Sequence, residues 1–303
     1  MAVYDGFLKR LDDRAFLGFR VWEFSFKSLS REYGHTFLKE VMLKHPHRTI
    51  QGCLAHRQFL QRGQIEGGVT YLLRGDEEAF LQEVVEGQED LIVGLGFCLK
   101  PMGAPPSGLE CPAGRPNHDC LYLARLDLRR QERVEPACQG CAIRVLGTQA
   151  LRAGGHVNIM TSALDIAHDI MIPAVERRRF RRAILFLCPF SVQAILLPLL
   201  ICGIQGLLVT YSSGNCLDYN QWLLADRGIK GERTKVEPGA LNKILSLLKE
   251  IEARRGDMYV RFERRGNIYA PISAQQAPPH QVQGRVGHPG ANQRSIAHPR
   301  LSA

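Results

Sequence analysis

Residues 183–211 read AILFLCPFSVQAILLPLLICGIQGLLVTY, and this stretch decides the fold class. Turn residues divide it into an apolar strand over 183–188, a helix over 190–203 and a second strand over 206–211. A membrane span is the competing interpretation, because the run is apolar and follows the basic sequence RRRFRR. Prolines and polar residues interrupt the run, so we expect a strand, a helix and a strand instead of a span.

The same alternation of elements continues towards the N-terminus. HVNIM, residues 156–160, reads as a strand, and the segment 161–180 that follows starts with hydroxyl residues suited to a helix N-cap. The apolar run LIVGLGFC, residues 91–98, suits another buried strand. Strands that alternate with helices form a parallel sheet with right-handed crossovers. We therefore predict an α/β fold, with a small Rossmann-like parallel sheet inside a cysteine-rich domain over 91–260.

Two further regions flank this domain. Residues 1–90 are predicted to be helical, because apolar residues recur at three- and four-residue spacings over 5–45, where Pro46 is expected to end the helix. Residues 238–255, PGALNKILSLLKEIEARR, lie within the domain and read as an amphipathic helix near its end. The segment 267–303 is rich in Pro, Gly, Gln and Ala and has no acidic residue, so we predict a disordered tail.

Composition bounds the class of protein. The chain has 303 residues, of which 45% are apolar and 23% charged, as in an ordinary globular protein. Its net charge of +9 is basic, but basicity alone is common, and we do not expect a nucleic-acid partner. Lys and Arg flank the N-terminal helical pattern, which leaves association with a membrane surface open.

The cysteines set the expected chemistry. Residues 1–20 lack the continuous apolar segment of a secretory signal, so we expect a cytoplasmic location. A reducing compartment disfavours disulfides, and the nine cysteines are then metal ligands, redox groups or buried thiols. An odd count also argues against a fully paired disulfide framework.

Four of the cysteines fall in one irregular stretch. Cys111, Cys120, Cys138 and Cys141 follow or lie within a segment whose prolines and glycines exclude a helix or an inner strand. Thiolates bind zinc and iron–sulfur clusters, and the spacing of Cys138 and Cys141 lets one turn present both sulfurs to the same metal. We predict a metal site on these four residues. The neighbouring His118 is a candidate proton carrier or fourth ligand, as is Asp119.

Other cysteines follow predicted strands. Cys98 and Cys188 end two strands, and Cys216 follows a third. Since the carboxyl ends of parallel strands meet at one sheet edge, we expect these thiols to converge there, with the cysteine-rich loop closing over them. Seven cysteines exceed one four-ligand site, so two clusters, or one cluster and a redox thiol pair, would account for them. Cys202 lies in an apolar helix and is treated as core. The candidates for binding the cofactor are Cys98, Cys111, Cys120, Cys188 and Cys216.

The order of these cysteines resembles that of an uncharacterised domain-of-unknown-function family, number one hundred and sixteen, of bacterial and archaeal proteins. The resemblance covers about residues 91–235. The matching residues are Cys98-Leu99, Cys111-Pro112-Ala113, Cys138 and Cys141 with Ile143, Cys188, and Gly214-Asn215-Cys216. Cys120 and the insertion around it have no counterpart in the family pattern. The resemblance implies an iron–sulfur or other metal-binding protein, without an established reaction.

Three functions follow as hypotheses. The first is a redox protein with an iron–sulfur cluster on Cys111, Cys138, Cys141 and either Cys98 or Cys120, which exchanges electrons with a redox partner protein or supports chemistry at the strand edge. The second is an interaction module stabilised by a structural zinc ion, without catalysis. The third is a metal-free thiol oxidoreductase that uses Cys138 and Cys141. The sequence indicates no catalytic residue and no substrate, and it leaves open whether the protein is an enzyme.

Overall fold

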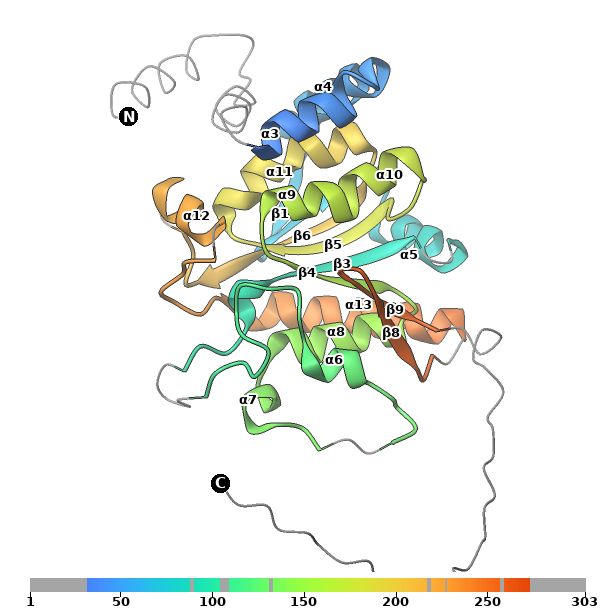
Figure 1. The fold of residues 1–303 in the computed structure, drawn as a ribbon. Coiled ribbons are helices and arrows are strands. Elements are labelled where there is room, and N and C mark those ends of the chain that lie inside the picture. Colours follow the sequence, from blue (N-terminus) through green and yellow to red (C-terminus); the bar gives the residue numbers. More distant parts are fainter. Residues whose placement is uncertain are drawn as a thin grey trace, which may run out of the picture.

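The protein has a mixed α/β fold built on one sheet with a largely parallel centre, as predicted (Figure 1). The computed structural model describes residues 32–87, 90–103, 109–130, 133–216, 219–226, 228–256 and 259–272. The parallel strands are neighbours in the order β4-β3-β5-β6. They are β3 (Leu91–Gly96), β4 (His156–Met160), β5 (Arg182–Leu187) and β6 (Gln205–Ser213).

Antiparallel strands extend the sheet on both sides. Beside β6 lie β2 (Val69–Leu72) and then β1 (Gln64–Glu66), so the region 1–90, for which only helices were predicted, also contributes two strands. Beside β4 lie β9 (Ile268–Pro271) and then β8 (Phe262–Arg265). The short strand β7 (Lys235–Val236) pairs with the end of β6.

Strand β9 corrects the prediction of a disordered tail over 267–303. Its four residues are too few to show a periodicity, but Tyr269 is fully buried and its hydroxyl accepts a hydrogen bond from the Cys120 backbone at 2.8 Å. The predicted tail was therefore wrong for Ile268–Pro271. Residues 273–303 lie outside the part of the chain that the structure describes.

Helices cover both faces of the sheet (Figure 1). On one face, α4 packs on α11, and α3 and the α9–α10 segment lie beside them. On the other face, α8 packs on α13 and α6, and α5 packs on α13. The helices and helical turns of the first face are α3 (Glu32–Phe37), η1 (Leu38–Met42), α4 (Pro46–Arg62), α9 (Ala163–Ile166), η3 (Ala167–Met171), α10 (Ile172–Glu176) and α11 (Pro189–Cys202). The remaining ones are α5 (Glu77–Glu86), η2 (Phe97–Leu99), α6 (Leu121–Arg125), α7 (Pro136–Gln139), α8 (Ala142–Arg152), α12 (Tyr219–Asp226) and α13 (Pro238–Arg255).

Two prolines mark helix boundaries. The helical segment before Pro46 ends at Met42, in agreement with the predicted stop, and Pro46 then occupies the first turn of the next helix, α4, where its fixed φ suits the helix and its missing N–H is not needed. Pro238 starts α13 in the same way, as predicted. Of the helix predicted over 5–45, residues 5–31 lie outside the described part.

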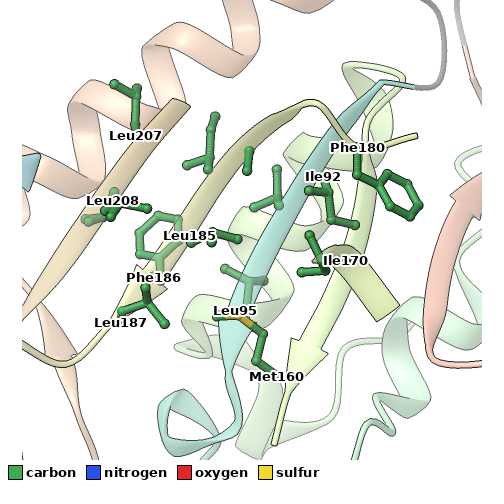
Figure 2. Packing of buried hydrophobic residues seen from close by; sticks show 14 of the residues in the cluster. Ile92, Leu95, Met160, Ile170, Phe180, Leu185, Phe186, Leu187, Leu207 and Leu208 are labelled. Carbon is green, nitrogen blue, oxygen red and sulfur yellow. The ribbon is translucent and has the colours of Figure 1, made fainter. Parts of the chain in front are cut away.

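The core lies between the sheet and its helices. Figure 2 shows the apolar side chains of neighbouring strands packed together, among them Ile92, Leu95, Leu185 and Leu207, which are all fully buried. Burial of one side chain of this size stabilises a fold by about 1.5–3 kcal/mol. A parallel sheet covered on both faces requires continuous apolar strands, which explains the character of the stretch 183–211.

The same packing decides against the membrane interpretation of that stretch. The apolar run divides into β5, α11 and β6, and α11 has only 14 residues. Among the described residues, no helix combines the length and the apolar character needed to cross a membrane.

Candidate functional site

A cavity of about 80 Å³ lies at the carboxyl ends of the parallel strands. The ends of β3, β4, β5 and β6 line it together with the first turn of α11, on the side of the sheet where α12 lies (Figure 1). Its lining is mostly apolar. Its polar and reactive groups are three thiols, several hydroxyls and one ammonium, and none of the described lining residues is acidic. The thiols belong to Cys98, Cys188 and Cys216, and the ammonium belongs to Lys230.

Cys188 is the N-cap of α11, directly after β5 ends at Leu187. Its Sγ accepts a hydrogen bond from the Ser191 backbone N–H at 3.4 Å and lies 3.0 Å from Ser191 Oγ. A hydrogen bond from the Cys216 thiol, together with these contacts to Ser191, lowers the pKa of Cys188 to about 6, although burial opposes the shift. The helix N-terminus favours negative charge at the same place. Cys188 is therefore placed to be a thiolate at neutral pH.

Cys216 is held opposite Cys188 by the turn that follows β6. Gly214 makes this turn with φ +66°, and a Cβ there would lie 2.4 Å from the Arg233 carbonyl oxygen, so only glycine fits. Lys230 Nζ donates to Cys216 Sγ at 3.4 Å. The hydrogen bond that Cys216 shares with Cys188 raises the pKa of Cys216, which therefore keeps its proton. The lowered pKa of Cys188 and the raised pKa of Cys216 together favour the negative charge of the pair on Cys188.

Tyr211 joins the strand ends that carry these thiols. Its hydroxyl donates to the Phe186 carbonyl at 2.6 Å and accepts from the Gly96 N–H at 3.1 Å, which links β6 to β5 and β3. A Cβ at Gly96 would lie 2.5 Å from this hydroxyl and 3.1 Å from Cys98 Sγ, so glycine makes room for both groups. Burial raises the pKa of Cys98, which interacts with Cys188 and is a neutral thiol of the cavity.

The other four predicted ligands form a second group, the loop group, in which Cys111, Cys120 and Cys141 lie near Lys100 and Cys138 lies beside Cys141. This lysine is 1% exposed, and its Nζ donates to the Gly114 carbonyl at 3.0 Å and to the carbonyl and Oδ1 of Asn117 at 2.9 and 2.6 Å. Burial lowers the pKa of Lys100, and the nearby thiols of Cys111, Cys120 and Cys141 oppose this effect. The chain thus brings these cysteines around one buried cation.

The thiols of this loop group differ from those of the cavity. Burial raises the pKa of Cys120 to about 11 and raises that of Cys138, and neighbouring thiols add to both shifts. Cys138 and Cys141 share a tight turn, in which the Cys141 N–H donates to the Cys138 carbonyl at 3.2 Å. Thiol donors suit iron and zinc. However, in the part of the chain that the structure describes, no three His, Cys, Asp or Glu side chains are grouped so that they could hold one ion.

The cysteine-rich loop packs over the sheet edge. Arg115 donates to the Lys230 carbonyl at 3.1 Å and to the Cys98 carbonyl at 3.4 Å. A Cβ at Gly228 would lie 2.4 Å from Pro116 Cβ, so the loop also touches the segment after α12. The loop group is therefore adjacent, at one end of the sheet, to the thiols of the cavity, Cys98, Cys188 and Cys216, which we call the cavity group.

The remaining candidates have structural surroundings. His118 Nδ1 lies 2.7 Å from the Ile159 carbonyl oxygen, and its Nε2 lies 3.5 Å from Asp165. Asp119 forms an ion pair with Arg264. Cys202 is buried in α11, as predicted.

Several residues of the cavity were missed. Ser191 follows Cys188 by three residues, which is the spacing of a helix cap, so this contact was within reach of the sequence. Lys230 lies in a loop without a motif, and Tyr211 looked like an ordinary strand residue. Only the folded chain brings these two side chains to the thiols.

Comparison of the chain with models of known protein families, with curated proteins and with solved structures gave no match. The family resemblance inferred from the order of the cysteines stays a prediction. What the protein does is therefore argued from the geometry of its described residues.

Proposed function

We propose that this chain is a thiol-based redox protein that uses Cys188 and Cys216 as a dithiol–disulfide pair. The observation that supports this most is the arrangement around Cys188: a thiolate capping a helix, with a protonated thiol hydrogen-bonded to it, inside a cavity at the carboxyl ends of parallel strands. Reactive cysteines sit in such surroundings, next to a second thiol that resolves the first product.

The proposed reaction is exchange with a disulfide of a redox partner. The Cys188 thiolate attacks one sulfur of that disulfide, forms a mixed disulfide and releases the other sulfur as a thiolate. Cys216 then attacks Cys188 Sγ, its proton passes to the released thiolate, and the first sulfur leaves in turn. The partner gains two electrons, and the chain ends with a Cys188–Cys216 disulfide. The ammonium of Lys230 stabilises the Cys216 thiolate as it forms.

A second candidate function is metal binding by the loop group, as an iron–sulfur cluster or a zinc ion on Cys111, Cys120, Cys138 and Cys141. The observation in its favour is the buried ammonium of Lys100 beside these thiols, because a cation offsets the repulsion among several thiolates. The described side-chain positions do not enclose an ion, so the thiols must close in on a metal to bind it. No step of the disulfide exchange passes through this group.

The exchange is tested by equilibrating the reduced full-length chain with mixtures of oxidised and reduced glutathione. Peptide mapping by mass spectrometry should find Cys188 joined to Cys216, with the loss of two hydrogens. Cys53→Ser, which removes a thiol on α4, is the matched control and should leave this disulfide unchanged. Oxidation that joins other cysteines while Cys188 and Cys216 stay reduced would contradict the proposal.

The metal candidate is tested separately by purification without oxygen, followed by metal analysis and a visible spectrum. Stoichiometric iron or zinc that is lost in Cys138→Ser and kept in Cys188→Ser supports the loop group as the site. A metal-free chain, or metal lost equally in both variants, rejects it.

A further inference from the structure

A second cavity lies at the opposite end of the parallel sheet. Its volume is about 200 Å³, and it is lined by His156, the first residue of β4, and by residues of the basic run RRRFRR that leads into β5. The sequence alone suggested only a solvated helix end for this run. It is separate from the thiol cavity, with which it shares no lining residue.

The cavity is strongly basic. Arg177, Arg179 and Arg265 line it together with His168, and Asp169 is the single acidic residue among its described lining residues. The Asp169 carboxylate already accepts hydrogen bonds from the amides of Asn158, at 3.2 Å, and Asn267, at 3.0 Å. Arg265 pairs with Glu263. Within the described part of the chain, neither Arg177 nor Arg179 forms an ion pair, so the cavity holds positive charge that its own residues do not neutralise.

His156, which lines the cavity, has an unpartnered ring nitrogen. Its side chain is 3% exposed, and its Nδ1 has no hydrogen-bond partner. Burial, with the nearby charge of Arg179, lowers the pKa of His156 to about 4, so the ring is neutral. A neutral imidazole has one nitrogen that donates a hydrogen bond and one that accepts, and Nδ1 has no partner for either role.

The backbone beside this histidine is held in an unusual conformation. Arg178 and Phe180 have φ values of +54° and +58°, which only glycine adopts readily, and such strain persists where the surrounding structure fixes it. Phe180 is buried with its ring 5.3 Å from that of His156, and the Arg179 guanidinium lies over the Phe180 ring at 4.7 Å. The strained turn thus fixes the guanidinium of Arg179 next to His156.

We propose that this cavity binds the phosphate group of a small phosphorylated molecule. Guanidinium groups match the oxygens of phosphate in a forked, charge-assisted geometry. A phosphate that carries one proton can both donate a hydrogen bond to His156 Nδ1 and accept one from it, whereas a carboxylate can only accept. Phosphate therefore suits both features of the cavity, its excess positive charge and its unpartnered ring nitrogen.

Calorimetric titration of the full-length chain with inorganic phosphate and with pyrophosphate, at constant ionic strength, tests the proposal. Arg179→Gln should lower the affinity at least about tenfold, as expected for loss of a charge-assisted contact. Arg178→Gln removes the same charge from the adjacent, exposed residue, which does not line the cavity, and should change the affinity less than twofold. Thermal unfolding of both variants checks that the turn still folds, and Arg177→Gln provides a second variant of the lining.

Three results would overturn the proposal: no binding of either anion, equal losses in Arg179→Gln and Arg178→Gln, or acetate binding as tightly as phosphate. Vesicles that contain a phosphoinositide separate the two sources of phosphate. If the chain binds free phosphate in the titration and does not sediment with the vesicles, the result supports a small soluble ligand. If the chain binds the vesicles but not free phosphate, and Arg179→Gln abolishes this binding, the ligand is a lipid headgroup and the proposal of a soluble ligand is overturned.

Discussion

The two cysteine groups lie at the same end of the sheet and have opposite properties. In the cavity group, the pKa of Cys188 falls to about 6, whereas in the loop group burial raises that of Cys120 to about 11. Cys188 caps a helix of 14 residues and accepts hydrogen bonds from Ser191 and Cys216. Cys120 also precedes a helix, α6, whose first N–H groups lower its pKa, but burial outweighs them and the neighbouring thiols of Cys141 and Cys111 add to its effect. A place at a helix N-terminus is therefore not sufficient for a low pKa, and the hydrogen bond from Cys216 distinguishes Cys188.

The largest expected contrast between the groups comes from removing their thiols. Cys188→Ser should abolish disulfide exchange and the fast phase of alkylation by iodoacetamide, because the lowered pKa of Cys188 makes this thiol the reactive one at neutral pH. Cys138→Ser should leave both unchanged. Peptide mapping after a short iodoacetamide pulse at neutral pH measures the effect. Fast alkylation that survives in Cys188→Ser would reverse the assignment of the two groups.

A smaller effect is expected from removing the donor to Cys188. Cys216→Ala takes away the hydrogen bond that lowers the pKa of Cys188 most, so the pKa should rise and alkylation of Cys188 at pH 6.5 should slow about tenfold. The variant should also accumulate the mixed disulfide with glutathione, because no resolving thiol remains. Cys53→Ala serves as the control. An unchanged rate together with complete turnover of the mixed disulfide would show that Cys216 has neither role.

The smallest effect should come from the cation. Lys230 lies 3.4 Å from Cys216 Sγ and lowers the pKa of both thiols of the pair, so Lys230→Met should slow alkylation of Cys188 about threefold near pH 6.5. Lys249→Met removes the same charge from the exposed face of α13 and is the matched control. Equal effects in the two variants would mean that only the net charge of the chain matters.

Much of the thiol cavity could be predicted from the sequence, because the carboxyl ends of parallel strands lie at the same edge of a sheet. Once residues 183–211 were divided into strand, helix and strand, the carboxyl ends of the strands had to meet, which placed Cys188 and Cys216 at one edge. Their charge state did not follow. It depends on the hydrogen bonds that Cys188 receives from Cys216 and Ser191 and on the contact of Lys230 with Cys216. These contacts join the start of α11 to the segments that follow β6 and α12, so they form only in the folded chain.

The sequence was less informative where contacts are long in range. Strand β9 has four residues and is fixed by the burial of Tyr269 against the cysteine-rich loop, which no local pattern reveals. The run RRRFRR looked like a solvated helix end, because the sequence does not show that it folds back beside His156. Local periodicity therefore predicted the central strands and helices, whereas the edges of the sheet and both cavities depend on tertiary packing.

The most direct measurement is the pH dependence of Cys188 alkylation in the full-length chain, followed for this one peptide by mass spectrometry. Only the thiolate reacts, so the rate should rise as the pH increases through the pKa of the thiol. Our account predicts a midpoint near 6, with the reaction close to its plateau at neutral pH. A midpoint near that of an ordinary cysteine, at about 8.5, would contradict it.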